Sequence, residues 1–157
     1  MLAARKVKTR AQSLPGTDVG RLRYSLYRQA YARISEASKK GFYLEAIAII
    51  ESLITDRLES RLTFLMDRDV SFKTLGNLIA EIRKMEMDET FKQLVSNDVD
   101  RWRASRNIAI HEMAKIADGE FLTWESRAKA IEAVAASGLT CLRAIDRRFK
   151  TLRKSGK

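Results

Sequence analysis

Apolar residues recur every three or four positions along most of the chain, which is the spacing of one face of an α-helix. The segments with the clearest pattern are residues 18–40, 42–66, 72–87, 89–95 and 124–153. Residues suited to helix N-caps precede them, namely Thr17 or Asp18, Ser71, Asp88 and Thr123. Breaks are expected at Gly41, Asn97–Asp98 and Asp118–Gly119. No strand-like alternation or internal repeat interrupts the pattern, so we predict an all-α antiparallel bundle of four to five helices.

A further stretch, residues 98–115, contains neither Pro nor Gly and holds the only histidine of the chain, His111. On a helical wheel, the apolar residues in and just after this stretch fall in one arc of about 120°. These residues are Val99, Trp102, Ala109, Ile110, Met113, Ile116 and Ala117. Arg106 points into the middle of the arc, whereas Asn107 and His111 lie together on its flank, four residues apart. The stretch is predicted to turn an arginine inward and to place an amide and an imidazole beside it.

The helix predicted over residues 42–66 is the most apolar, yet it carries Glu51 on its apolar face. A carboxylate in that position costs free energy unless it is paired or reaches water. One interpretation is a bend or groove that opens Glu51 to solvent. The other is an ion pair with Arg106, the inward arginine of the later helix. Arg57 and Arg61 lie on the same apolar arc and are rival partners for Glu51.

The chain of 157 residues suits one domain, expected over residues 17–154, and its 45% hydrophobic and 32% charged content is typical of soluble globular proteins. The net charge of +10 lies entirely in residues 1–16 and 147–157, which carry four and six basic side chains and no acid. Residues 1–16 end at Pro15-Gly16 and are expected to form a mobile basic arm. Such ends either contact phosphate backbones or act as solubilising tails.

Composition also argues against several classes of site. Cys141 is the only cysteine, which excludes an internal disulfide, suits a reducing cytoplasm and favours a packing role. One histidine, one cysteine and no clustered carboxylates do not make the usual zinc sites, and no glycine-rich phosphate loop is present, so neither a metal nor a cofactor is expected. No apolar run approaches the roughly 20 residues of a membrane helix. We therefore expect a cytoplasmic protein without membrane partners.

The six residues from Arg106 to His111, Arg-Asn-Ile-Ala-Ile-His, resemble the Arg-x4-6-His motif of the HEPN superfamily in its Arg-Asn-x-x-x-His form. A late helix, an inward arginine and an all-helical chain of suitable length support the resemblance. It covers roughly residues 17–154 as a helix pattern, but its specific part is these six residues. Many HEPN proteins are metal-independent ribonucleases of toxin–antitoxin, phage-defence and CRISPR systems. Others have lost catalysis and serve as binding or assembly modules.

The motif residues suit RNA cleavage by the RNA's own 2′-hydroxyl, which needs a proton acceptor, a proton donor and a cation. Histidine titrates near pH 6.5 and serves either proton-transfer role, while arginine stays charged and binds phosphate oxygens. Asn107 can hold the imidazole of His111 or the phosphate. Arg103 either extends a phosphate track or is a surface charge. Two residues after His111 stands Met113, where some toxin subfamilies have tyrosine, so regulation through that tyrosine is not inferred.

The resemblance implies that two protomers pool their motifs in a shared cleft, because one protomer supplies a single histidine. The expected function is a homodimeric, metal-independent endoribonuclease acting on RNA, as a toxin or phage-defence effector with an antitoxin or regulatory protein as a further partner. The catalytic residues would be Arg106, Asn107 and His111, with Glu51 supporting the site and Arg103 binding RNA. A non-catalytic HEPN module that binds RNA, a nucleotide or a protein, and a helical scaffold with basic tails, are the alternatives.

Overall fold

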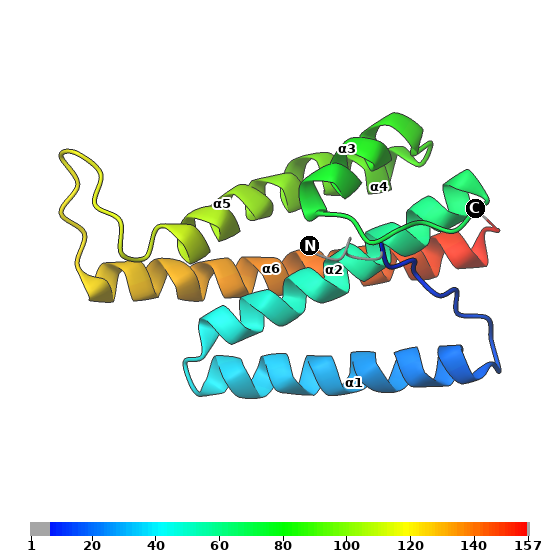
Figure 1. The fold of residues 1–157 in the computed structure, drawn as a ribbon, viewed down its shortest axis with the longest axis horizontal. Helices are drawn as coiled ribbons and strands as arrows, with labels where there is room; N and C mark the ends of the chain where they lie inside the picture. Colours follow the sequence, from blue (N-terminus) through cyan, green and yellow to red (C-terminus); the bar gives the residue numbers. More distant parts are fainter. Residues whose placement is uncertain (1–6, 157) are drawn as a thin grey trace, which may run out of the picture.

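The computed structural model describes residues 7–156, which fold almost entirely into helices (Figure 1). The elements are α1 (Asp18–Lys39), α2 (Tyr43–Met66), α3 (Leu75–Met85), α4 (Glu89–Gln93), the π-helix η1 (Leu94–Val99), α5 (Asp100–His111) and α6 (Trp124–Lys154). The only β-type pairing among the described residues is an isolated bridge between Thr9 and Ser71. The prediction of an all-α bundle is confirmed.

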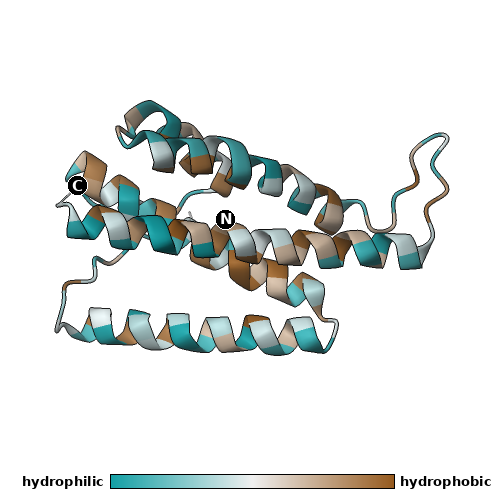
Figure 2. Cartoon of the chain, turned by 180° about the vertical axis from the view of Figure 1, so that it is seen from behind, coloured by the Kyte–Doolittle hydropathy of each residue, from teal (hydrophilic) through white to brown (hydrophobic). Residues whose placement is uncertain are grey.

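The helix α2 occupies the centre of the bundle and packs against α1, α3 and α6, while α5 lies along α6. Figure 1 shows that α1 and α2 run antiparallel, as do α5 and α6, whereas α2 and α6 run in the same direction. Figure 2 shows apolar residues concentrated on α2. The largest fully buried side chains are Phe91, Ile34, Ile47, Ile50, Ile54, Leu58, Leu62, Leu78, Ile79, Ile82, Leu142 and Ile145. None of the described helices combines the length and apolar character that a membrane crossing requires.

Side chains cap three of the helices at the predicted positions. The hydroxyls of Thr17 and Thr123 and the carboxylate of Asp88 each accept a hydrogen bond from a backbone amide in the first turn that follows. At the end of α1, Gly41 adopts a left-handed φ of 78°, which glycine reaches without a Cβ clash. These local signals are why the sequence located the bounds of α1 and α6 to within about one residue.

The third helix begins later than predicted, at Leu75, and its cap is Thr74 rather than Ser71. Ser71 is held in extended backbone because residues 8–10 and 70–72 exchange two backbone hydrogen bonds, of 3.0 and 2.9 Å. Because the Phe72 N–H donates to the Lys8 carbonyl oxygen, residues 71 and 72 belong to the bridge, and the helix begins only after Thr74. The partner strand comes from more than 60 positions away, and no local pattern reveals it.

The same pairing changes the picture of the N-terminal arm, which the sequence predicted to be mobile. In the described part of the arm, Arg10 is only 6% exposed and donates to the Asp56 carboxylate at 2.8 and 3.3 Å. The Arg23 guanidinium donates to Ser13 and to the Ala11 carbonyl oxygen. A buried guanidinium with a bidentate partner anchors the arm to α2. Residues 1–6 lie outside the described residues.

The break predicted at Asn97–Asp98 is wrong. The chain stays helical from Glu89 to His111, passing through the π-helix η1 between α4 and α5. The side chain of Asn97 donates to the side chain of Gln93 at 2.7 Å, one turn earlier, instead of capping a new helix. The wider π turn accommodates the change of phase between α4 and α5 without interrupting the helix.

The helix α5, which carries the Arg106–His111 motif, ends at His111 and not at Lys115. The part of the predicted apolar arc that follows His111 is therefore wrong. Arg127 of α6 donates to the backbone carbonyl oxygens of Glu112, at 2.7 Å, and Lys115, at 2.8 Å. These bonds hold the residues after α5 in turns. As a result Ile116, predicted to face the core, is 77% exposed.

Within α5 and just before it, the predicted arc packs against α6 at a close crossing marked by Gly138, except for Ile110, which is 38% exposed. Val99, Trp102 and Ala109 are buried. The Trp102 indole N–H donates to the Val134 carbonyl oxygen at 2.9 Å. A Cβ atom at position 138 would lie 2.6–2.8 Å from the Trp102 ring, so only glycine permits this approach. The crossing fixes α5, and with it the motif, relative to the long helix α6.

Candidate functional site

The helix α5, which carries the motif from Arg106 to His111, forms one wall of an open groove of about 570 Å³, which we call the motif groove. The opposite walls come from α2 and from the start of α3, so residues far apart in the sequence meet here. The polar and charged residues that line it are Glu51, Ser52 and Thr55 from α2, Lys73 and Thr74 before α3, and Arg103, Arg106 and Asn107 from α5. Four of the five residues that the sequence nominated for the site therefore share one groove.

The predicted pairing of Glu51 with Arg106 is present. The Arg106 Nη2 atom donates to the Glu51 carboxylate, and Nη1 donates to Asn107 Oδ1 at 2.6 Å. The side chain of Arg106 is 13% exposed and that of Glu51 is 27% exposed, so the pair sits at the groove wall rather than in the core. Asn107 thus holds the guanidinium, and not the imidazole that the sequence offered as one of its partners.

The third nitrogen of this guanidinium is not satisfied by the protein. The Arg106 Nε atom is buried and has no hydrogen-bond partner among the described residues. A buried donor left without a partner typically costs about 1–3 kcal/mol, and more when it is charged. Unpaired donors of this kind are uncommon in native structures, and they occur at functional sites. The arginine is held at two nitrogens and unsatisfied at the third.

Arg103 lies on the same wall, one turn before Arg106, and is held by a carboxylate of its own helix. Its Nε atom donates to Asp100 at 2.8 Å, and Arg83 donates to the same carboxylate at 2.8 Å. The hydrogen bond from Arg103 is the main cause that lowers the pKa of Asp100, aided by Arg83 and opposed by burial. Asp100 therefore stays ionised and orients Arg103 at the groove.

The groove is a mixed rather than a purely basic surface. It is lined by three cationic side chains and one carboxylate, that of Glu51. Lys73 is paired with Glu81 at 2.8 Å, just as Arg103 and Arg106 have their own carboxylate partners. A phosphate bound here would meet cations whose positions are already fixed, but whose charge is partly balanced.

His111 stands apart from the groove. It is exposed, it is not among the groove-lining residues, and its side chain makes no hydrogen bond to another described residue. It is the last residue of α5, one helical turn or about 6 Å beyond Asn107. A single chain therefore brings Arg106, Asn107, Glu51 and Arg103 together but leaves the imidazole at the end of the groove wall.

The two rival partners of Glu51 are occupied elsewhere. Arg57 donates to Asp146 at 2.7 Å. Arg61 makes a two-pronged contact with Glu86, with hydrogen bonds of 2.6 and 2.7 Å. Both arginines point away from the groove to carboxylates that lie 25 or more positions later in the chain. Sequence reasoning missed these partners because neither carboxylate interrupts an apolar face.

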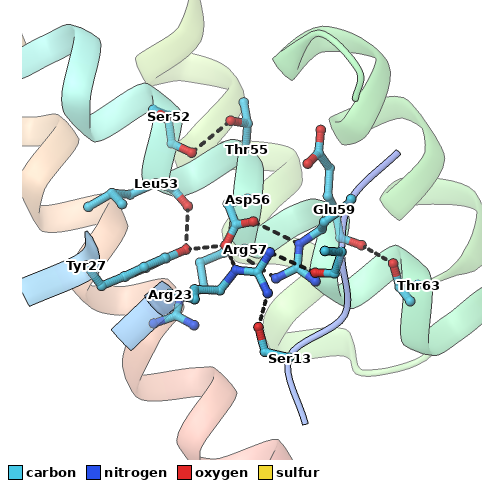
Figure 3. Close-up of polar contacts among 12 residues, drawn as sticks. Ser13, Arg23, Tyr27, Ser52, Leu53, Thr55, Asp56, Arg57, Glu59 and Thr63 are labelled. Atoms are coloured by element: carbon cyan, nitrogen blue, oxygen red, sulfur yellow. Dashed lines mark hydrogen bonds and ion pairs between the residues drawn. The ribbon is translucent and has the colours of Figure 1, made fainter. Parts of the chain in front are cut away.

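Sequence reasoning also missed a polar hub around Asp56, on the next turn of α2. The Tyr27 hydroxyl donates to Asp56 at 2.7 Å, and Arg23 approaches the same carboxylate at 3.5 Å (Figure 3). Burial is the main cause that raises the pKa of Tyr27 far above its usual range. The sequence around Asp56 gives no sign of this role, which depends on Arg10 from the N-terminal arm.

The remaining nucleophile and the metal-ligand inventory add no second site. Cys141 is buried, and burial raises the pKa of its thiol to about 11, which fits the predicted packing role. Within residues 7–156 there is no group of three or more His, Cys, Asp or Glu side chains placed to hold a metal ion.

No protein-family model matches this chain, and neither a curated protein nor a solved structure does. The likeness to the HEPN superfamily therefore rests on the residues from Arg106 to His111 and on the helical pattern. The function has to be argued from the groove and from the position of His111.

Proposed function

We propose that this chain is a metal-independent endoribonuclease of the HEPN type, which acts as a homodimer with Arg106, Asn107 and His111 at its site. The observation that supports this most is the state of Arg106. Glu51 and Asn107 hold its two terminal nitrogens at the wall of an open groove, its Nε is unsatisfied, and an exposed imidazole follows five residues later.

The proposed reaction is transesterification within the RNA. The 2′-oxygen attacks the adjacent phosphorus, the bond from phosphorus to the 5′-oxygen breaks, and the products carry a 2′,3′-cyclic phosphate and a 5′-hydroxyl. The 2′-hydroxyl loses its proton to one imidazole, and the departing 5′-oxygen gains a proton from an acid, which a second imidazole would supply. Arg106 stabilises the extra charge on the phosphate oxygens in the transition state.

Two copies are needed because each groove holds an arginine but no imidazole. A two-fold dimer that joins the α5 helices end to end or side by side would place two His111 side chains beside two Arg106 side chains. Closed two-fold dimers are also the commonest oligomers. In this proposal RNA is the substrate, the biological role is that of a toxin or phage-defence effector, and an antitoxin or regulatory protein restrains it.

The alternative is a non-catalytic module of the same type that binds RNA, a nucleotide or a partner protein. It is favoured by the pairing of each groove cation with a carboxylate and by the distance of His111 from the groove. In that case the exposed cations of the C-terminal helix, such as Lys150, Arg153 and Lys154, would supply most of the attraction to phosphate.

Incubation of the purified protein with total RNA in EDTA tests the proposal. Cleavage products ending in 2′,3′-cyclic phosphate are expected. His111→Ala should lower the rate by about 10²–10⁴-fold, and Arg106→Ala by about 10²–10³-fold. The double variant should be little worse than either single variant, because the residues act as one unit. Lys84→Ala, an exposed change on α3 outside the groove, is the matched control and should cleave normally.

Full activity in purified His111→Ala would contradict the assignment of the imidazole. If the wild type cleaves nothing but shifts RNA on a gel, the binding module is the better account. Replacing Lys150, Arg153 and Lys154 by glutamine should then weaken binding more than Arg106→Ala does. If the protein neither cleaves nor shifts RNA, both RNA functions are contradicted and the helical scaffold remains.

A further inference from the structure

Large apolar side chains gather, uncovered, where α5 passes into α6. The α5–α6 loop, residues 112–123, projects beyond the start of α6 (Figure 1). Phe121 is 91% exposed, Ile116 is 77% exposed and Leu122 is 56% exposed. Single exposed apolar residues need no explanation, but a group of them on one projecting segment marks an interaction site.

An apolar groove lies at the base of this loop, and we call it the end groove. Its volume is about 500 Å³, close to that of the motif groove. It is lined by Phe42, Leu44, Met113, Trp124, Ala128 and Ile131, which come from the start of α2, the loop and the start of α6. Phe42, at 54%, and Trp124, at 65%, leave much of their apolar surface in water.

The loop and the surroundings of the end groove carry opposite charges. Asp118 and Glu120 are exposed on the loop, and neither forms an ion pair with a described residue. The corner between α1 and α2, which forms one wall of the end groove, carries the exposed Lys39 and Lys40. Lys40 is paired with Glu36 at 2.8 Å, and Glu45, which lines the groove, is paired with Arg33 at 2.7 Å, so Lys39 is the basic charge in excess at this edge. An acidic apolar loop thus matches an apolar groove with a basic edge.

The loop does not fill the end groove of its own chain. Arg127 binds the carbonyl oxygens of Glu112 and Lys115 and, at 3.4 Å, that of Leu122, which ties both ends of the loop to α6. The part between these ends projects away, and Phe121 stays almost fully exposed. The same loop from another copy is apolar and acidic, and it could therefore cover the apolar groove with its basic edge.

We propose that two copies of this chain dimerise by seating the α5–α6 loop of each in the end groove of the other. A two-fold axis makes the two contacts equivalent and closes the assembly. Both loops are then buried, so no further copies can add to the dimer through them. Phe121 and Leu122 enter the apolar groove, while Asp118 and Glu120 face Lys39 and Lys40 of the other copy.

This arrangement also brings a second copy of the chain to the end of the motif groove, which in one copy holds Arg106 but no imidazole. Met113 lines the end groove, and His111 stands only two residues before it. The seated loop brings the second copy alongside His111 at the end of α5. The inference rests on the proposed function in this one respect, that the pooled site requires a dimer; its test measures mass and affinity rather than cleavage, so the two fail separately.

Light scattering and sedimentation over a range of micromolar concentrations provide the test. The wild type should have twice the 17.9 kDa chain mass. Phe121→Asp on the loop and Leu44→Asp in the end groove should each raise the dissociation constant at least about 30-fold, the effect of losing an interface hot spot. Met87→Asp is the matched control, because Met87 is 89% exposed but lies between α3 and α4. It should remain dimeric.

A charge exchange separates a docking contact from a general effect on folding. Asp118→Lys with Glu120→Lys should weaken the dimer, and so should Lys39→Glu with Lys40→Glu. A chain that carries all four changes has a basic loop and an acidic groove edge, and its affinity should return toward that of the wild type. Circular dichroism should show the same helix content in every variant, since all four side chains are exposed.

A monomeric wild type across this range, or a dimer that withstands both Phe121→Asp and Leu44→Asp, would overturn the proposed surface. Failure of the fourfold variant to regain affinity would overturn the assigned charge contacts. If Phe121→Asp is a monomer that still cleaves RNA at the wild-type rate, the surface stands and the pooled site of the proposed function is wrong.

Discussion

Among the arginine–carboxylate pairs that attach α2 to the later part of the chain, Arg61–Glu86 and Arg106–Glu51 are built differently. Arg61 and Glu86 have side chains that are 7% and 0% exposed, and two hydrogen bonds join them. The Asp88 amide donates to the same Glu86 carboxylate at 2.9 Å. Arg106 and Glu51 are 13% and 27% exposed, they border a groove, and the Arg106 Nε is unsatisfied.

The difference separates a structural pair from one available to a ligand. The Arg61–Glu86 pair is closed to water, and its carboxylate is fully used, so a ligand could bind only by breaking it. The Arg106–Glu51 pair fixes a partly exposed guanidinium at the groove wall, while its buried Nε has no partner among the described residues. Preorganised charge of this kind is what stabilises a transition state, because no reorganisation is needed during the reaction.

The largest expected effect is on stability at the closed pair. Glu86→Ala leaves the Arg61 charge buried without a partner, which typically lowers the free energy of unfolding by about 3–5 kcal/mol. Glu51→Ala leaves Arg106 bonded to Asn107 and near solvent, so a loss of about 1–3 kcal/mol is expected. Urea unfolding followed by circular dichroism measures both. Equal losses would mean that the two pairs are equally closed and that the comparison fails.

An intermediate effect is expected at the crossing that positions the motif helix. Gly138→Ala places a Cβ atom 2.6–2.8 Å from the Trp102 ring, well inside van der Waals contact, and overpacking of this kind costs typically about 1–3 kcal/mol. Gly76→Ala is the matched control, because its Cβ would meet only the Arg103 side chain, at 3.9 Å or more. It should leave stability unchanged or raise it. A Gly138→Ala protein as stable as the wild type would show that α5 and α6 separate easily.

The smallest effect concerns the dependence of stability on pH at the Asp56 hub. Burial works to raise the pKa of Asp56, but hydrogen bonds from Arg10 and Tyr27 and the charges of Arg10 and Arg23 outweigh it and lower the pKa. A carboxyl whose pKa is lower in the folded state stabilises the protein above its unfolded pKa of about 3.9 and loses this as the pH falls through the folded value.

The free energy of unfolding should therefore decrease on acidification below about pH 4, and it should decrease less steeply in Asp56→Asn. Urea titrations at several acidic pH values compare the two proteins. Parallel curves would show that Asp56 has the same pKa in the folded and unfolded chains, contrary to the burial and hydrogen bonding of the hub.

The sequence revealed those features whose cause lies within a few residues. Thr17, Asp88 and Thr123 marked helix starts because a cap acts on the turn directly after it. The inward positions of Glu51 and Arg106 followed from helical periodicity. Because both are charges of opposite sign on apolar faces, the sequence also predicted that they pair.

The features that the sequence did not reveal depend on residues that are distant along the chain. Ser71 lost its capping role to a bridge with Thr9, and the basic arm is anchored because Arg10 meets Asp56. The motif helix ends at His111 because Arg127 takes the next backbone carbonyl oxygens. Helical periodicity alone extends a helix until a local signal stops it, so the exposed position of His111 could not be predicted.

The most direct test compares the two arginines by the same substitution. Arg106→Lys and Arg61→Lys each keep the charge but lose the planar fork. The rate of RNA cleavage in EDTA is measured for each and divided by the folded fraction from circular dichroism. We predict that Arg106→Lys loses about 10²–10³-fold per folded molecule, whereas Arg61→Lys keeps the wild-type rate. Equal rates per folded molecule, or no cleavage by the wild type, would contradict the assignment of Arg106 to a catalytic site.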